Sequence, residues 1–152
     1  MKAILFDLDG VLYQAESALT GAAQTLAWVR RQRIPHLFLT NTTSRPRSAV
    51  RDKLARFGLR VGLERILTPP VAAREWLARR KAFPVALFVP EATREDLSDV
   101  EVLPDDAREG ARAVVLGDLG EGWDYATLNR AFRLLMAEPR PYLVALGMTR
   151  YW

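Results

Sequence analysis

Ala3-Ile4-Leu5-Phe6-Asp7-Leu8-Asp9-Gly10 combines a short apolar run with two acidic residues two positions apart. The run Ala3–Phe6 is typical of a strand buried on both faces of a parallel sheet. Because ligands of open α/β sheets bind beyond the carboxyl ends of the strands, we expect Asp7 and Asp9 to lie where a substrate can reach them. Gly10 lets the backbone turn sharply after the pair.

Two carboxylates around one point repel each other unless a cation or a shared proton intervenes. The chain has no Cys and a single His, His36, so oxygen ligands favour Mg²⁺ over a softer transition metal. With Mg²⁺ bound, one Asp could attack a phosphoryl group and form an aspartyl-phosphate, while the other donates a proton to the leaving oxygen. On their own, Asp7 and Asp9 could equally be ordinary turn-forming residues.

A second apolar run, His36–Leu39, follows a predicted helix over residues 21–33. A strand–helix–strand unit of this kind is right-handed and its strands are parallel, so Thr40 and Asn41 should reach the edge that carries the two aspartates. Hydroxyl, amide and free backbone N–H groups can hold phosphate oxygens there. Alternatively, the segment from Thr40 to Ser44 is a polar loop in which Ser44 caps the next helix.

Strands and helices are predicted to alternate along the rest of the chain. Helices are expected over residues 46–57, 69–81 and 125–137, a short helical turn over residues 91–97, and strands over residues 66–67, 84–89, 113–116 and 142–146. Asp124 is expected to cap the last helix. The alternation predicts the α/β class with a Rossmann-like parallel-sheet core.

The composition argues against several classes of protein. An apolar content of 49% and a charged content of 26% are ordinary for a soluble globular protein. The net charge of +4 raises nucleic acid as a partner, but the 22 basic residues are interleaved with 18 acidic ones, so we expect no nucleic-acid partner. No apolar run reaches the roughly 18 residues that a membrane span needs, so we expect no membrane partner. The absence of Cys fits a cytoplasmic location.

Phe6-Asp7-Leu8-Asp9-Gly10-Val11-Leu12-Tyr13 resembles the first motif of the haloacid dehalogenase superfamily of phosphotransferases. The resemblance implies that Asp7 is the nucleophile and a Mg²⁺ ligand. It implies that Asp9 is the general acid/base and gives its backbone carbonyl to the metal.

Leu39-Thr40-Asn41-Thr42 resembles the second motif of the same family. The resemblance implies that Thr40, Asn41 and Thr42 bind the phosphate. With the first motif, it implies a Mg²⁺-dependent phosphatase that acts on a small phosphorylated substrate.

Residues from about 71 onward resemble the α/β cap of the branch that includes the phospholysine phosphohistidine inorganic pyrophosphate phosphatases and the NagD-like proteins. The match includes Gly117–Tyr125, so Trp123 and Tyr125 are expected in the core or on the surface of the cap. The resemblance divides the chain into the N-terminal part of the core, residues 1–70, and an incomplete cap domain, residues 71–152.

The family's third and fourth motifs, a Lys and a Gly-Asp that helps to hold Mg²⁺, are missing from the expected places, so we expect the chain to stop within its cap. A rival interpretation takes Asp118 and Asp124 as the fourth motif, with Lys53 or Lys81 as the missing Lys. Without these groups Mg²⁺ loses a ligand and the charge around Asp7 is uncompensated, so we expect the chain alone to be severely impaired.

Three further expectations concern alternatives and assembly. The chain could be a catalytically incompetent phosphate- or Mg²⁺-binding fragment, or a partner subunit that keeps the fold. A nucleotide-binding Rossmann domain is disfavoured, because no G-x-G-x-x-G follows the first strand. An incomplete core sheet would leave an open edge and apolar surface near Ile4 and Leu39. Dimers that form through the cap are common in the family that this sequence resembles. For both reasons we expect a homo-oligomer.

Overall fold

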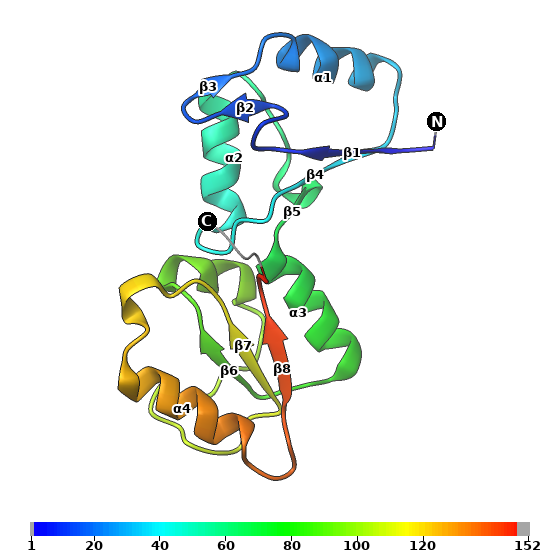
Figure 1. Cartoon of the computed structure of the whole chain (residues 1–152). Coiled ribbons are helices and arrows are strands. Elements are labelled where there is room, and N and C mark those ends of the chain that lie inside the picture. The colour runs from blue at the N-terminus through cyan, green and yellow to red at the C-terminus, as the bar shows by residue number, and fades with distance from the viewer. Residues whose placement is uncertain (1, 149–152) are drawn as a thin grey trace. The chain divides into compact units, whose positions relative to one another are not determined.

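A computed structural model describes residues 2–148, and its contacts divide the chain into two compact units (Figure 1). Unit 1 contains the described residues up to Thr42 together with Arg47–Thr68, and unit 2 contains Thr43–Pro46 and the described residues from Pro69 onward. Each unit is built on a parallel sheet, which confirms the predicted α/β class. The identification of the units as core and cap stays a prediction.

Unit 1 is a three-stranded parallel sheet with two helices, a short 3-10 turn and a small hairpin. The sheet has the order β1–β4–β5, with β1 (Ile4–Asp7), β4 (His36–Leu39) and β5 (Ile66–Leu67). The helical elements are α1 (Ala22–Arg31), α2 (Arg47–Arg56) and η1 (Leu63–Arg65). The hairpin, which the sequence did not predict, consists of β2 (Tyr13–Gln14) and β3 (Ser17–Ala18).

One face of the sheet in unit 1 carries its hydrophobic core. Phe38 of β4 is fully buried in a cluster with Leu26 of α1 and Leu54 of α2. The opposite face is open, since Leu5 of β1 is 62% exposed and Leu37 of β4 is 39% exposed. The prediction that the first strand is buried on both faces is therefore wrong. The reason is topological: two right-handed crossovers that step in the same direction place both helices on the same face.

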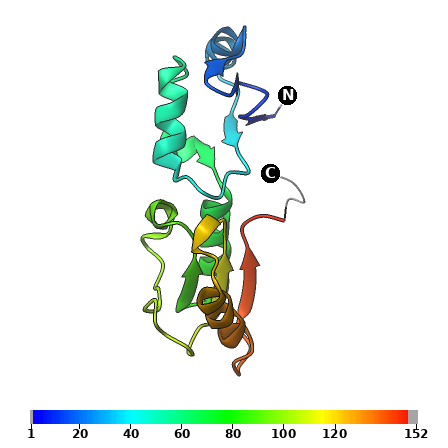
Figure 2. The same ribbon diagram turned by 60° about the vertical axis from the view of Figure 1, so that its left-hand side comes forward.

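Unit 2 is a three-layered α/β structure. Its parallel sheet has the order β6–β7–β8, with β6 (Val85–Phe88), β7 (Ala113–Leu116) and β8 (Tyr142–Ala145). Its helical elements are α3 (Pro69–Arg80), η2 (Glu91–Leu97), η3 (Gly120–Gly122) and α4 (Tyr125–Leu135). The sheet lies between α3 on one side and α4 on the other (Figure 2).

The two faces of the unit 2 sheet explain its continuous apolar strands. Leu87 and Val115 pack in a cluster with Leu77 of α3, whereas Phe88 and other residues of alternate register pack with Leu134 of α4. All four residues of β6 are buried. A strand covered on both faces has no reason to alternate apolar with polar residues.

A buried hydrogen bond explains why the chain enters unit 2 for four residues before it returns to unit 1. The side-chain Oγ1 of Thr93, which is fully buried in η2, donates to the backbone oxygen of Thr43 at 3.2 Å. This bond holds the start of the segment Thr43–Pro46 in unit 2. No helix within residues 2–148 has both the length and the apolar character that crossing a membrane requires.

Asp124 caps α4, as the sequence predicted. Its Oδ1 accepts a hydrogen bond from the backbone N–H of Thr127 at 2.7 Å, and this bond lowers the pKa of the Asp124 carboxyl below its ordinary value. The helix ends at Leu135, two residues before the predicted end.

We predict that Asp124→Ala lowers the melting temperature near neutral pH, because the first turn of α4 loses its acceptor. A carboxyl whose native pKa is depressed stabilises the fold above its unfolded pKa, about 3.9, and this stabilisation is lost as the pH falls through the lower native pKa. Melting curves of the two proteins should therefore converge in acid. Asp124→Asn keeps the cap without the titration, and a constant difference between wild type and Asp124→Ala at all pH values would contradict the assignment.

The open face of unit 1 leads to a second prediction, which compares Phe38 on the covered face of β4 with its neighbour Leu37 on the open face. Phe38→Ala should lower the free energy of unfolding by about 3–5 kcal/mol, because it empties the core. Leu37→Ala should lower it by about 1 kcal/mol or less, because little buried surface is lost. Urea denaturation of both variants tests this, and equal losses would mean that both faces are covered.

Candidate active site

Asp7 and Asp9 lie on either side of a buried residue, Leu8, at the carboxyl end of β1. Both aspartates are exposed, whereas Leu8 between them is fully buried. The backbone oxygen of Leu8 accepts a hydrogen bond from the N–H of Leu12 at 2.9 Å, and Gly10 adopts a positive φ of 73°, which closes the turn. The buried leucine therefore holds both carboxylates on the solvent side.

The carboxylate of Asp7 is oriented by the backbone. Its Oδ1 accepts a hydrogen bond from the N–H of Leu8 at 2.9 Å, which occupies one oxygen and fixes the rotation of the group. Within residues 2–148 no cationic side chain forms an ion pair with Asp7 or Asp9. The second oxygen of Asp7 is thus available to a ligand or a metal ion.

The second polar turn leaves the sheet beside the first. β1 and β4 are parallel, and their register pairs Asp7 with Leu39, so Thr40 begins the turn next to Asp7. Adjacent strands lie about 4.8 Å apart, which brings the two turns within reach of one small ligand. The sequence predicted this meeting of the two turns from the crossover alone.

Hydrogen bonds fix the shape of the second turn. The N–H of Thr40 donates to the backbone oxygen of Leu67 at 3.2 Å, and the N–H of Thr42 donates to Thr40 Oγ1 at 3.2 Å. Because Thr40 Oγ1 acts as the acceptor, its own proton remains free to donate. Asn41 is exposed at the tip of the turn. The turn therefore offers a hydroxyl proton and an amide to an incoming anion, while its catalytic role stays a prediction.

Asp7 and Asp9 fit part of a Mg²⁺ site. Among residues 2–148 no group of three His, Asp or Glu side chains could hold a metal ion. Mg²⁺ is commonly held by one or two carboxylates, with water and substrate phosphate as the remaining ligands, so two exposed aspartates without a cationic partner suit it. The described residues would leave the other positions to water, to the phosphate or to another part of the protein.

Asp118 and Asp124, the acidic residues of the rival interpretation, both lie in unit 2, and that interpretation stays a prediction. Asp118 follows β7 in the sheet of unit 2, whereas Asp7 ends a strand in the separate sheet of unit 1. Asp118 Oδ1 accepts a hydrogen bond from the N–H of Gly120 at 3.2 Å, and Asp124 is engaged as the helix cap. Neither residue belongs to a possible metal cluster within the described chain.

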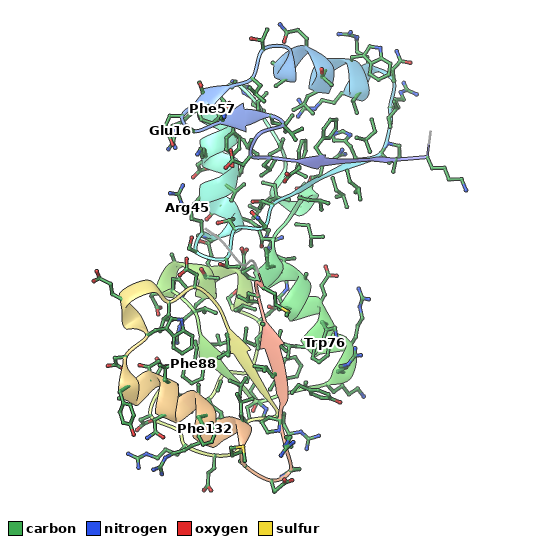
Figure 3. All side chains as sticks on the ribbon, in the orientation of Figure 1. Glu16, Arg45, Phe57, Trp76, Phe88 and Phe132 are labelled. Atoms are coloured by element: carbon green, nitrogen blue, oxygen red, sulfur yellow. The ribbon has the colours of Figure 1, made fainter. Side chains whose placement is uncertain are left out.

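The two lysines of the rival interpretation have other positions. Lys53 Nζ lies 3.3 Å from Glu16 Oε1 and 4.5 Å from the centroid of the Tyr13 ring, so it joins α2 to the hairpin. Figure 3 labels Glu16 at the hairpin. Lys81 is exposed at the end of α3, in unit 2. Lys53 is thus occupied at the hairpin, and Lys81 lies outside the unit that contains Asp7.

Thr43 is the residue that the sequence did not single out. It is 2% exposed, and within the described chain its Oγ1 has no hydrogen-bond partner. The run of similar residues from Thr40 to Ser44 gave no signal that one member is buried, because that burial depends on contacts with distant parts of the chain.

The chain is similar in sequence to known hydrolases. Over its whole length the chain is 29% identical to the phospholysine phosphohistidine inorganic pyrophosphate phosphatase of Rattus norvegicus, of which it covers 55%. It is 32% identical to the haloacid dehalogenase-like hydrolase domain-containing protein 2 of the same organism, also at 55% coverage. The chain therefore spans about half the length of the curated relatives that it matches.

The fold also matches a solved phosphatase. A glycerol phosphate phosphatase from Mycobacterium tuberculosis, crystallised in complex with magnesium, superposes with a TM-score of 0.79 at 27% identity, covering 97% of this chain and 44% of the other. Residues 4–102 match the family model of the haloacid dehalogenase-like hydrolases, which is more than half of the chain. The resemblance seen in the two motifs is confirmed: the chain belongs to the haloacid dehalogenase-like hydrolase family.

Proposed function

We propose that the protein represented by this chain is a Mg²⁺-dependent phosphatase that acts on a small phosphorylated substrate through an aspartyl-phosphate. The observation that carries the proposal is the register of β1 against β4, in which Asp7 lies beside the start of the Thr40 turn. The printed names of the rat relative and of the mycobacterial structure, both phosphatases, support it.

The two aspartates would divide the chemistry between them. The free carboxylate oxygen of Asp7 attacks phosphorus, and the bond from phosphorus to the leaving oxygen breaks as Asp9 donates its proton to that oxygen. Asp9 then takes a proton from a water molecule, which attacks the phosphorus of the aspartyl-phosphate and releases inorganic phosphate with Asp7 restored. Mg²⁺, when bound, offsets the negative charge that gathers on the phosphoryl oxygens.

The second turn would hold the oxygens that are not transferred. Thr40 donates its free hydroxyl proton, and Asn41 offers its side-chain amide and its backbone N–H. Thr42 contributes by donating its own N–H to Thr40, which orients the Thr40 hydroxyl. Such neutral donors position the phosphate without adding a charge that competes with Mg²⁺.

The chain alone should turn over slowly. No cation among the described residues pairs with Asp7, so the repulsion between carboxylate and phosphate is left to Mg²⁺ alone. The absence of a cation beside Asp7 is also the reason for the alternative function, a fragment or subunit that binds phosphate or Mg²⁺ without turnover.

We also propose a cytoplasmic location, which the absence of cysteine supports.

We predict that any Mg²⁺-dependent hydrolysis of 4-nitrophenyl phosphate falls to the background rate in Asp7→Asn, because the nucleophile is gone. Asp9→Asn should reduce the rate by about 10²–10⁴-fold, the usual contribution of a general acid/base. The exposed Asp52 of α2 provides the matched control, Asp52→Asn, which should leave the rate unchanged.

Each outcome of this assay is informative. Turnover that survives in Asp7→Asn would contradict the proposed mechanism. Mg²⁺-dependent phosphate binding without turnover, lost in Asp7→Asn, would favour the binding-only alternative. A wild-type rate as fast as that of ordinary phosphatases would contradict the expected impairment.

We further propose that the protein is a homo-oligomer that associates through α4. Four large apolar residues at helical spacing, each more than half exposed, lie on or directly after this helix: Tyr125, Leu128, Phe132 and Met136. Figure 3 labels Phe132 on α4. In an antiparallel pair of these helices, Glu121 near the start of one copy would face Arg133 near the end of the other. Apolar surface and complementary charge together suit a second copy of this chain.

We predict that Phe132→Glu shifts the protein toward monomers, because a charge would enter the centre of the apolar stripe on α4. Light scattering at micromolar concentration measures the mass. Ala78→Glu, a change at an exposed position of α3, is the control and should leave the mass unchanged. A wild-type monomer would refute the proposal.

A further inference from the structure

The hairpin β2–β3 follows the turn that carries Asp7 and Asp9, and the connection between its two strands is strained. Ala15 and Glu16 form that connection, and Ala15 adopts a positive φ of 51°. A residue other than glycine is disfavoured in this left-handed conformation, which persists only where surrounding contacts hold it. A two-stranded hairpin is also marginally stable by itself in water. The hairpin therefore depends on a contact outside its own strands.

Lys53 of α2 makes that contact. Its side chain is only 15% exposed, and its Nζ lies 3.3 Å from Glu16 Oε1. The same Nζ lies 4.5 Å from the centroid of the Tyr13 ring and 5.9 Å from that of the Phe57 ring. Figure 3 labels Glu16, in the hairpin, and Phe57, directly after α2. An ammonium group that is largely removed from water is attracted more strongly to aromatic faces than an exposed one, so Lys53 fastens the hairpin to α2.

The hairpin in turn holds the peptide group that joins Asp9 to Gly10. The backbone oxygen of Tyr13 accepts a hydrogen bond from the N–H of Gly10 at 2.8 Å, and Asp9 and Tyr13 form an isolated β-bridge. A peptide group is planar, so a bond that fixes the N–H of Gly10 also fixes the direction of the Asp9 carbonyl. The side chain of Asp9 branches from the Cα atom at the end of this peptide. Contacts thus run from Lys53 through Tyr13 and Gly10 to Asp9, all within unit 1.

We propose that Lys53 is a positioning residue for Asp9. It fastens the hairpin, and the hairpin fixes the peptide after Asp9 and so the place of the Asp9 carboxyl group. Within residues 2–148 Lys53 forms its ion pair with Glu16 and none with Asp7 or Asp9, so it acts through Tyr13 and not by direct contact. This inference rests on the proposed phosphatase function for the role of Asp9, whereas the contacts themselves do not depend on that function.

Hydrogen exchange of the chain without Mg²⁺ tests these contacts directly. Lys53→Met keeps a long apolar side chain and removes the charge. We expect the Gly10 amide to exchange about tenfold faster in Lys53→Met than in the wild type, and at close to the wild-type rate in Lys53→Arg, which keeps the charge. The amide of Thr25 in α1, which donates to Gly21, is the internal reference and should not change.

Lys2→Met is the matched control, because it removes the same charge at an exposed position of unit 1 and should leave the Gly10 amide unchanged. An unchanged Gly10 amide in Lys53→Met would overturn the proposal. Equal acceleration at Gly10 and Thr25 would overturn it as well, because it would mean a general loss of stability.

Glu16→Lys tests the same contact from the other side. The Glu16 side chain is 76% exposed, so its replacement removes little buried surface, but it brings a second ammonium group close to Lys53. We expect faster exchange of the Gly10 amide at low salt, with a return toward the wild-type rate as added salt screens the repulsion. A Gly10 rate that does not respond to this change at low salt would overturn the proposal.

Kinetics separate this inference from the phosphatase proposal. Ethoxide is a poor leaving group, so ethyl phosphate depends more on the proton from Asp9 than 4-nitrophenyl phosphate does. Lys53→Met should therefore lower kcat for ethyl phosphate about tenfold more than kcat for 4-nitrophenyl phosphate. Equal losses would contradict a path through Asp9 and leave the phosphatase function standing. Faster exchange at Gly10 in a chain without any turnover would leave the contact of Lys53 with the hairpin standing and remove the phosphatase proposal.

Discussion

The parallel pairing of β1 with β4 is the constraint on which the candidate active site depends. It aligns Asp7 with Leu39, so the two polar turns leave the sheet at one edge. Buried Phe38 fixes this register, because a slip of one residue would turn its ring from the covered face to the open one. The buried side chains that fix the register of the sheet therefore also determine which polar residues lie together at its carboxyl end.

Unit 2 repeats the same physical rule with a different result. Its strands also end at one edge, but the groups that meet there are the carboxylate of Asp118, the buried hydroxyl of Thr43 and the aromatic ring of Trp123 instead of two carboxylates. The two sheets belong to separate units of the chain.

Much of this arrangement could be predicted from local sequence. The strand His36–Leu39 is a short apolar run between Pro35 and a polar cluster, and the structure has the same bounds. Long-range features could not be predicted. The hairpin was missed because its turn at Ala15 takes a positive φ of 51° without the Gly or Asn that usually marks such a turn. The open face of β1 was missed because Leu5 is as apolar as its buried neighbours, and the burial of Thr43 depends on Thr93, fifty residues away.

The most direct test of the central claim, that Asp7 accepts the phosphoryl group, is ¹⁹F NMR of the chain with beryllium fluoride, a phosphoryl mimic that binds a nucleophilic carboxylate without needing turnover. A bound fluoride resonance that requires Mg²⁺ and disappears in Asp7→Asn, but persists in Asp52→Asn, is the expected result. A bound resonance that survives in Asp7→Asn would contradict the assignment of Asp7 as the nucleophile, and so would its absence from a folded protein at saturating Mg²⁺.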